Sequence, residues 1–246
     1  MKQITVTSVT DLCGRIEHEE FQDHDGTTVI YRGLPDIGFR LIPKAGRFNK
    51  PRSNDPVDER MMLELFRRNS MGLTGFDLTD DWELLALAQH HGMATRLMDW
   101  TRSPLVAAFF AVQNPNERYD QAECNKSSGH FICSKPKSVI YAWRVQKVFL
   151  HMKPAKNPLE LRSDVVRYIP RHMTPRIRAQ SGLFSVHKNP RVELVDQGMV
   201  QLVIPNGQRG PIKRSLYRLG IHEATIYPDL DGTARHIEWL QTDKKP

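Results

Sequence analysis

The sequence predicts an α+β fold of small mixed or antiparallel sheets with flanking helices. Segments with strand alternation and segments with helical spacing both occur, but they do not follow each other regularly as βαβ units do. This irregular order argues against Rossmann and TIM-barrel architectures. The 246 residues are enough to bury one large core, and 39% hydrophobic with 26% charged residues is the composition of a soluble globular protein.

The predicted strands are short and rich in β-branched and aromatic residues. Residues 27–33 follow the turn signal Asp25-Gly26. Residues 138–145 alternate in a way that places their apolar side chains on one face, namely Val139, Tyr141, Trp143 and Val145. Further short strands are expected at residues 165–170, 198–205 and 224–227.

The predicted helices combine apolar spacing with end signals. Residues 57–71 are amphipathic, and a helix over residues 80–91 begins with Asp80 or Asp81 as its N-cap. Other helices are expected at residues 105–112, 176–180, 210–219 and 230–241. Residues 34–56 and 113–136 are polar or rich in Pro and Gly, which predicts a long loop and a surface excursion.

Residues 89–112 combine a polar segment with the most apolar helix of the chain. Ser103 at the N-cap and Pro104 at the first helical position mark the start of that helix. Residues 105–112 contain no polar side chain, so we expect this helix to be buried on every side. A buried helix that follows a polar segment is a rigid support for reactive groups, and we expect the function here.

Charge, cysteines and hydropathy limit the class of protein. The net charge of +7 is spread along the chain and suits either a solvated surface or a phosphate-bearing ligand. Cys13, Cys124 and Cys133 form no disulfide framework. The longest apolar run, residues 105–112, is too short to span a bilayer, and the first residues lack a signal-peptide layout. We expect a cytoplasmic protein without membrane contact.

Common cofactor and hydrolase motifs are absent from the sequence. There is no G-x-G-x-x-G, Walker A, H-E-x-x-H or G-x-S-x-G pattern. Cys124, His130 and Cys133 lack C-x-x-C spacing and a fourth ligand nearby. No metal site is therefore expected.

Tyr31-Arg32-Gly33, at the end of the first predicted strand, fits a phosphate site. The guanidinium would bind a phosphate through two hydrogen bonds, and the glycine would let a ligand approach the backbone. The structural alternative is a salt bridge from Arg32 to Asp99.

Other polar residues of the central stretch also have two interpretations. His90 and His91 before Gly92 fit either a site or a helix C-terminus that Gly92 ends. Arg96 and Asp99 are spaced to pair with each other. Thr101 and Ser103 are candidates for a site or for helix capping. Glu223 is either a loop charge or a carboxylate placed at a cleft, and Gln180 lies in a polar turn.

These residues together resemble the FRG domain family, which is named after an aromatic-Arg-Gly motif. The resemblance rests on Tyr31-Arg32-Gly33, on Gln89-His90-His91-Gly92 with residues 95–104, and on later matches at residues 180–184 and 220–232. Tyr31 replaces the Phe of the family name, and Met98 stands where Leu is usual. The resemblance implies a single domain over residues 1–246, with a core of about residues 20–240.

A weaker resemblance is to ADP-ribosyltransferases. They place an aromatic-Arg-Gly strand, a Ser/Thr segment before a buried helix, and a catalytic Glu in this order. The resemblance implies that Arg32 holds NAD phosphates, that Thr101 and Ser103 brace the nicotinamide ribose, and that Glu223 stabilises an oxocarbenium-like transition state. The usual E-x-E pair and Ser-Thr-Ser segment are absent, and Gln180 competes with Glu223 for the third position.

The expected function is therefore an NAD-consuming enzyme, either an ADP-ribosyltransferase or an NAD glycohydrolase, acting as a bacterial or phage toxin or defence effector. Its site would contain Glu223 and Arg32 as catalytic residues. The expected substrate-binding residues are Tyr31, Gly33, His90, Arg96, Asp99, Thr101, Ser103 and Gln180. NAD or a related nucleotide is the expected ligand, with a protein or nucleic-acid acceptor. The alternative is a non-catalytic module that binds a nucleotide or nucleic acid.

Overall fold

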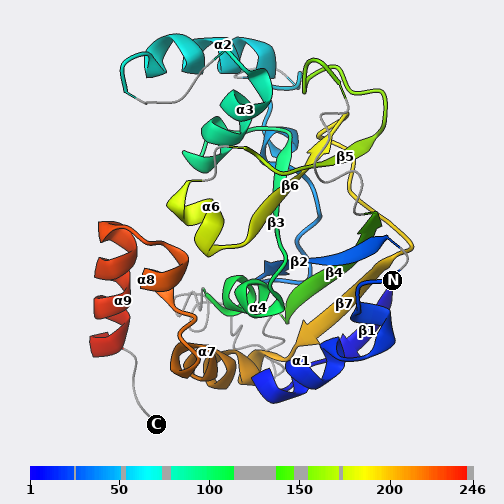
Figure 1. Cartoon of the computed structure of the whole chain (residues 1–246), viewed down its shortest axis with the longest axis vertical. Helices are drawn as coiled ribbons and strands as arrows, with labels where there is room; N and C mark the ends of the chain where they lie inside the picture. Colours follow the sequence, from blue (N-terminus) through cyan, green and yellow to red (C-terminus); the bar gives the residue numbers. More distant parts are fainter. Residues whose placement is uncertain are drawn as a thin grey trace, which may run out of the picture. The chain divides into compact units, whose positions relative to one another are not determined.

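The computed structural model describes residues 1–24, 26–50, 54–73, 79–113, 137–146, 155–171 and 174–242 (Figure 1). Its contacts divide the chain into two compact units. Unit 1 contains Met1–Phe39, Thr101–Val145 and Asp196–Pro246, and unit 2 contains Arg40–Trp100 and Gln146–Val195. The polar excursion and its zinc candidates Cys124, His130 and Cys133 lie outside the described residues.

Unit 1 contains a mixed sheet with the strand order β1-β7-β4-β2. These strands are β1 (Lys2–Thr5), β2 (Thr27–Leu34), β4 (Ser138–Gln146) and β7 (Met199–Ile204). β1 runs parallel to β7, and β4 runs antiparallel to β7 with Ile140 opposite Leu202. The predicted α+β class with a mixed sheet is thereby confirmed.

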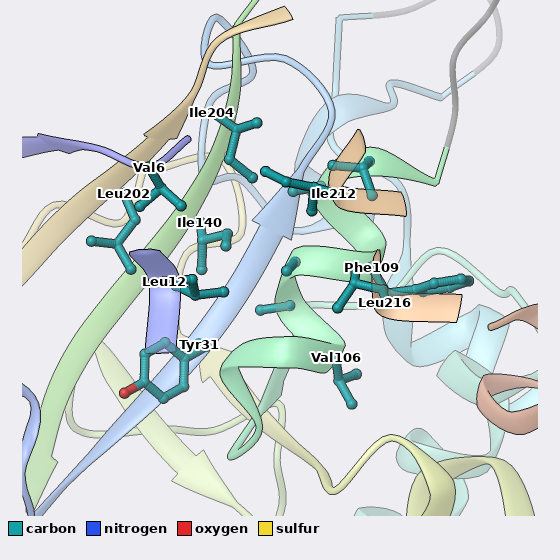
Figure 2. Packing of buried hydrophobic residues seen from close by; sticks show 14 of the residues in the cluster. Val6, Leu12, Tyr31, Val106, Phe109, Ile140, Leu202, Ile204, Ile212 and Leu216 are labelled. Atoms are coloured by element: carbon teal, nitrogen blue, oxygen red, sulfur yellow. The ribbon is translucent and has the colours of Figure 1, made fainter. Parts of the chain in front are cut away.

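Unit 1 contains five helices among its described residues. They are α1 (Val9–Ile16), α4 (Pro104–Val112), α7 (Arg209–Arg218), α8 (Glu223–Ile226) and α9 (Leu230–Thr242), with short 3-10 turns at Glu19–Phe21 and Asn206–Gln208. All of these helices except α9 contribute apolar side chains to one buried cluster with this sheet. Figure 2 shows Ile140 and Leu202 of the sheet in one apolar cluster with Phe109 of α4 and Leu216 of α7. Full burial of side chains of this size contributes about 1.5–3 kcal/mol each, so this layer stabilises most of unit 1.

The helix α4 begins as the sequence predicts. Ser103 is its N-cap, and the Ser103 hydroxyl accepts a hydrogen bond from the Val106 N–H at 3.3 Å. Leu105 and Phe110 are partly exposed, while most of the other side chains are buried. The helix is therefore buried on nearly every side, because it lies between the sheet and the other helices of unit 1.

Gly33 is the point where α4 comes closest to the sheet. A Cβ atom at this position would lie 1.8 Å from the Ala107 carbonyl oxygen and 2.7 Å from the Ala111 nitrogen. The expectation that Gly33 leaves room for a ligand is therefore wrong, because the backbone of α4 fills that room. Alternation along β2 places Tyr31 on this same face and Arg32 on the opposite one.

Unit 2 contains the strand order β3-β6-β5. These strands are β3 (Leu97–Thr101), whose last residue belongs to unit 1, β5 (Val165–Tyr168) and β6 (Gly182–His187), and β5 runs antiparallel to β6. The helices are α2 (Glu59–Ser70), α3 (Asp81–His90) and α6 (Pro175–Ala179), with a 3-10 turn at Lys44–Arg47. Trp82 packs in its core against Tyr168, with ring centroids 4.9 Å apart.

The end of α3 follows the predicted glycine signal. Gly92 has a φ of 85°, its N–H donates to the Gln89 carbonyl at 3.0 Å, and the Met93 N–H donates to the Ala88 carbonyl at 2.9 Å. This pair of bonds is the Schellman motif, in which glycine avoids the strain that a Cβ would cause at positive φ.

The short strand predicted at residues 224–227 is wrong. Glu223–Ile226 form the helical turn α8 instead. The Thr225 hydroxyl accepts a hydrogen bond from the His222 N–H at 3.0 Å, and the Tyr227 N–H donates to the Glu223 carbonyl at 2.8 Å. Glu223 and Ile226 are the buried residues, three positions apart, which is helical spacing that four residues cannot distinguish from a strand. β1, α1, β3 and β6 were not predicted.

Replacement of Gly33 by Ala is expected to destabilise the protein by about 3 kcal/mol, because α4 must move away from β2 to admit the methyl group. Gly14→Ala is the matched control. A Cβ at Gly14 in α1 meets nothing within 4 Å, so this change should stabilise by about 0.5–1 kcal/mol. Urea unfolding of both variants measures the difference. Equal stabilities would show that the contact of α4 with β2 does not limit the fold.

Candidate functional site

A cavity of about 460 Å³ lies among α7, α8 and α9 of unit 1 and is called the α7–α9 cavity below. Four cationic side chains and two carboxylates line it, together with one tryptophan. The lining residues with charge or an aromatic ring are Arg209, Lys213, Arg214, Arg235, Glu223, Glu238 and Trp239. The cations outnumber the carboxylates, so the cavity favours an anionic ligand.

Glu223 contributes a buried carboxylate to this cavity. The residue is 8% exposed at the first position of α8. Its carboxylate accepts a hydrogen bond from the Gln113 side-chain amide at 3.3 Å and lies 3.7 Å from the Arg235 guanidinium. Gln113 also contacts the Tyr227 hydroxyl at 3.2 Å, and Arg235 lies over the Tyr227 ring at 4.8 Å. Glu223 is thus held in place and has a cation beside it.

The cations of the cavity come from two helices. Arg209 and Lys213 are four residues apart on α7 and therefore share one side of it, and Arg214 follows directly. Arg235 comes from α9. The Lys213 ammonium lies 5.2 Å from the centre of the Trp239 ring, a cation–π contact. This arrangement brings cationic groups to the side of a flat aromatic ring.

Arg32 and Glu223 lie on different sides of the unit 1 sheet. Alternation turns Arg32 away from the face that α4 covers, whereas Glu223 is bonded to Gln113 at the C-cap of α4. The hydrogen bond and ion pair of Glu223 go to Gln113 and Arg235. Arg32 is half-buried, and burial raises the pKa of the neighbouring Tyr31 to about 12, with the Asp23 charge adding to the shift.

Thr101 and Ser103 act within the backbone that leads into α4. The buried Thr101 hydroxyl accepts a hydrogen bond from the Ser103 N–H at 3.0 Å, and Thr101 pairs with Tyr31 across β3 and β2. Ser103 caps the helix as described above. Both side chains thus have a structural role at the start of α4, as the helix-capping interpretation of the sequence predicts.

In unit 2, the central motif forms a hydrogen-bonded turn between α3 and β3. The Gln89 side chain donates to the exposed Asp99 carboxylate at 3.1 Å and accepts from the Thr95 hydroxyl at 2.6 Å. Thr95, fully buried, also accepts from the Leu97 N–H at 3.1 Å. His90 lies on α3 with its Nδ1 atom 3.4 Å from the Thr174 hydroxyl. The motif therefore fixes how the chain leaves the helix and enters the strand.

Arg96 is bonded to Glu59, and its expected pairing with Asp99 is wrong. Its guanidinium donates to the two carboxylate oxygens of Glu59 at 2.9 and 3.2 Å. The backbone N–H of Arg96 donates to the same carboxylate at 2.8 Å. A further guanidinium N–H contacts the carbonyls of Leu159 and Lys188 at 3.3 Å. These bonds use most of its donors and give Arg96 a structural role, because Glu59 at the start of α2 is buried and needs a cation.

Unit 2 also contains a serine and a histidine side by side, two side-chain types that are common in catalytic sites. Ser185 and His187 on β6 are 2.9 Å apart, but both are fully buried, and the Ser185 hydroxyl accepts from the Trp100 indole at 2.9 Å. This trio is a core network. Gln180 is the C-cap of α6 and precedes Ser181, which has a φ of 48°.

The residues that surround Glu223 were not predicted from the sequence. Lys213, Arg214, Arg235 and Trp239 were read as parts of ordinary helices. The basic residues of α7 at positions 209, 213 and 214 were the available signal, since this spacing gives a helix a cationic side. Their approach to α9 depends on tertiary packing that no local pattern carries.

The FRG domain family matches residues 27–120. This match confirms the resemblance to the FRG family that the aromatic-Arg-Gly motif and the central motif predict. Searches of curated proteins and of solved structures found no match. The FRG match contains Arg32 and the central motif, while Gln180, Glu223 and the cationic residues of the cavity follow it.

The described residues contain neither a metal-binding cluster nor a membrane-spanning helix. Over the described ranges, no group of three or more His, Cys, Asp or Glu side chains is placed to hold a metal ion. In the same part of the chain, no helix combines the length and the apolarity that crossing a bilayer requires.

Arg96→Lys is expected to lower the free energy of unfolding by about 3 kcal/mol, because lysine cannot contact both oxygens of the buried Glu59. Arg60→Lys is the control. Arg60 pairs with Glu160 in solvent, and its replacement should change stability by less than about 0.5 kcal/mol. The check is urea unfolding followed by circular dichroism. If Arg96→Lys lowered the free energy of unfolding no more than the control does, the structural role of Arg96 would be contradicted.

Proposed function

We propose that the α7–α9 cavity binds a nucleotide. The observation that carries this proposal is the presence of four cations, a buried carboxylate and a tryptophan around one cavity. Its volume of about 460 Å³ falls within the range of small-molecule sites, about 300–1,000 Å³. A phosphate chain, a ribose and a base can each contact one of these three kinds of group.

Each group of the cavity has a part of the nucleotide to contact. The guanidinium groups of Arg209, Arg214 and Arg235 present paired N–H donors that match phosphate oxygens. The Trp239 ring supplies a surface on which a base can stack. The Glu223 carboxylate accepts hydrogen bonds and is therefore suited to ribose hydroxyls rather than to phosphate.

NAD cleavage is the second candidate function, because Glu223 lines the same cavity. A buried carboxylate beside a bound ribose can stabilise positive charge as nicotinamide leaves. Transfer of ADP-ribose to an acceptor, or hydrolysis, would follow, and a toxin or defence role depends on this activity. Arg32 is not among the residues that line the cavity, so this proposal gives it no contact with NAD.

Arg214→Ala should weaken nucleotide binding by about 10- to 100-fold, because one charge-assisted bond to phosphate is worth about 1.5–3 kcal/mol. The control is Arg218→Ala, on the same helix but outside the cavity lining. Titration calorimetry with NAD, ADP and ADP-ribose measures both. Binding should also weaken as salt is raised, since the contacts are ionic. Failure of all three ligands to bind at low salt, or equal affinities of the two variants, would refute the site.

Nicotinamide release from NAD tests the second candidate. If Glu223 stabilises the transition state, Glu223→Gln should lower the rate by about 100-fold or more while NAD still binds. Asp231→Asn, an exposed change on α9, should leave the rate unaltered. Binding of NAD without nicotinamide release by the wild type would reject the enzyme and retain the binding module.

A further inference from the structure

Two histidines stack on each other where α8 and α9 meet. The rings of His222 and His236 have centroids 4.0 Å apart and planes inclined by 12°. His222 is the N-cap of α8, directly before Glu223, and His236 directly follows Arg235 on α9. Each ring is thus the sequence neighbour of one partner in the Glu223–Arg235 ion pair.

The surroundings of the pair suit two neutral rings. Tyr217 of α7 packs on both of them, with centroids 5.7 and 5.6 Å away, and Trp239 lies 6.3 Å from His236. Both Nδ1 atoms are buried, and within the described residues neither has a hydrogen-bond partner. A proton added to these rings would therefore gain no acceptor at Nδ1.

The helices that meet at the pair carry charged side chains of both signs. The three neighbouring helices carry Lys213 and Arg214 on α7, Glu223 on α8, and Arg235 and Glu238 on α9. The Glu223 carboxylate is already engaged by Arg235 and Gln113. Burial lowers the pKa of His222, and the His236 ring lowers it further.

We propose that the His222–His236 stack is a pH-sensitive joint between α8 and α9. At neutral pH, the uncharged rings hold α9 against α8. Acidification that charges both rings makes them repel at stacking distance and releases α9. Because α9 supplies Arg235, Glu238 and Trp239 to the α7–α9 cavity, its release removes one wall of that cavity. The joint is a property of the fold and does not depend on which ligand the cavity takes.

The direction of the pH dependence follows from linkage. The folded state lowers the pKa of His222, so the unfolded or released state binds more protons as pH falls. The stabilisation from the neutral stack is complete above the ordinary histidine pKa of about 6.5 and is lost as pH falls through the lowered value. Docking of α9 should therefore weaken in mildly acidic solution and recover on neutralisation.

Hydrogen exchange of the intact protein tests the joint, with amide protection factors of Leu230–Thr242 compared at about pH 7.5 and pH 5. The wild type should lose protection by about tenfold at the lower pH. His236→Phe retains an aromatic ring but removes one of the two charges, so its protection should change by less than about twofold. Protection of Gly182–His187 in unit 2 is the internal reference.

Two results would overturn the proposal: unchanged wild-type protection of α9 at the lower pH, or an equal loss in wild type and His236→Phe. If the variant does not fold, ring titration of the wild type by NMR still decides. Titration of both histidines with no loss of α9 protection would contradict the joint. Each of these readouts is made without nucleotide, so a negative result here leaves the proposed ligand site untouched.

Discussion

The backbone contact between α4 and β2 is the constraint on which unit 1 depends. At Gly33, the sheet and the helix approach so closely that a single methyl group has no room. The buried residues Ala107, Ala108 and Ala111 of α4 have side chains small enough to permit this approach. The end of α4 then places Gln113 beside Glu223 and Tyr227. The small residue in the aromatic-Arg-Gly motif thus serves packing and, through packing, positions the cavity carboxylate.

Local signals in the sequence were sufficient for most helices and strands. Ser103-Pro104, Asp80 and Gly92 determine helix ends through bonds to residues within a few positions, and these ends lie where expected. Residues 224–227 were misread because four residues carry too little periodicity to separate a turn of helix from a strand. β3 was missed because it has only five residues and its partner strands are distant in sequence.

The candidate site could be predicted only in part, because its residues are of two kinds. Arg96, Thr95, Thr101 and Ser103 were visible as a motif, yet their hydrogen bonds go to the chain itself. Glu223 was visible by its place between apolar segments. Its cationic neighbours come from α7 and α9, and the sequence of neither helix indicates that the two helices line the same cavity. A motif that holds a turn together looks the same in sequence as one that holds a ligand.

The burial of Glu223 connects the ligand site to the stability of α8 and α9. A buried carboxylate is costly unless a cation or donors accompany it, and here Arg235 and Gln113 do so. Arg235 stays beside Glu223 only while α9 lies against α8, and the stacked histidines at the adjacent positions hold that contact. Loss of the stack would leave the carboxylate with less compensation. The ion pair and the neutral ring pair therefore stabilise one junction together, and a change in the charge of either pair acts on both.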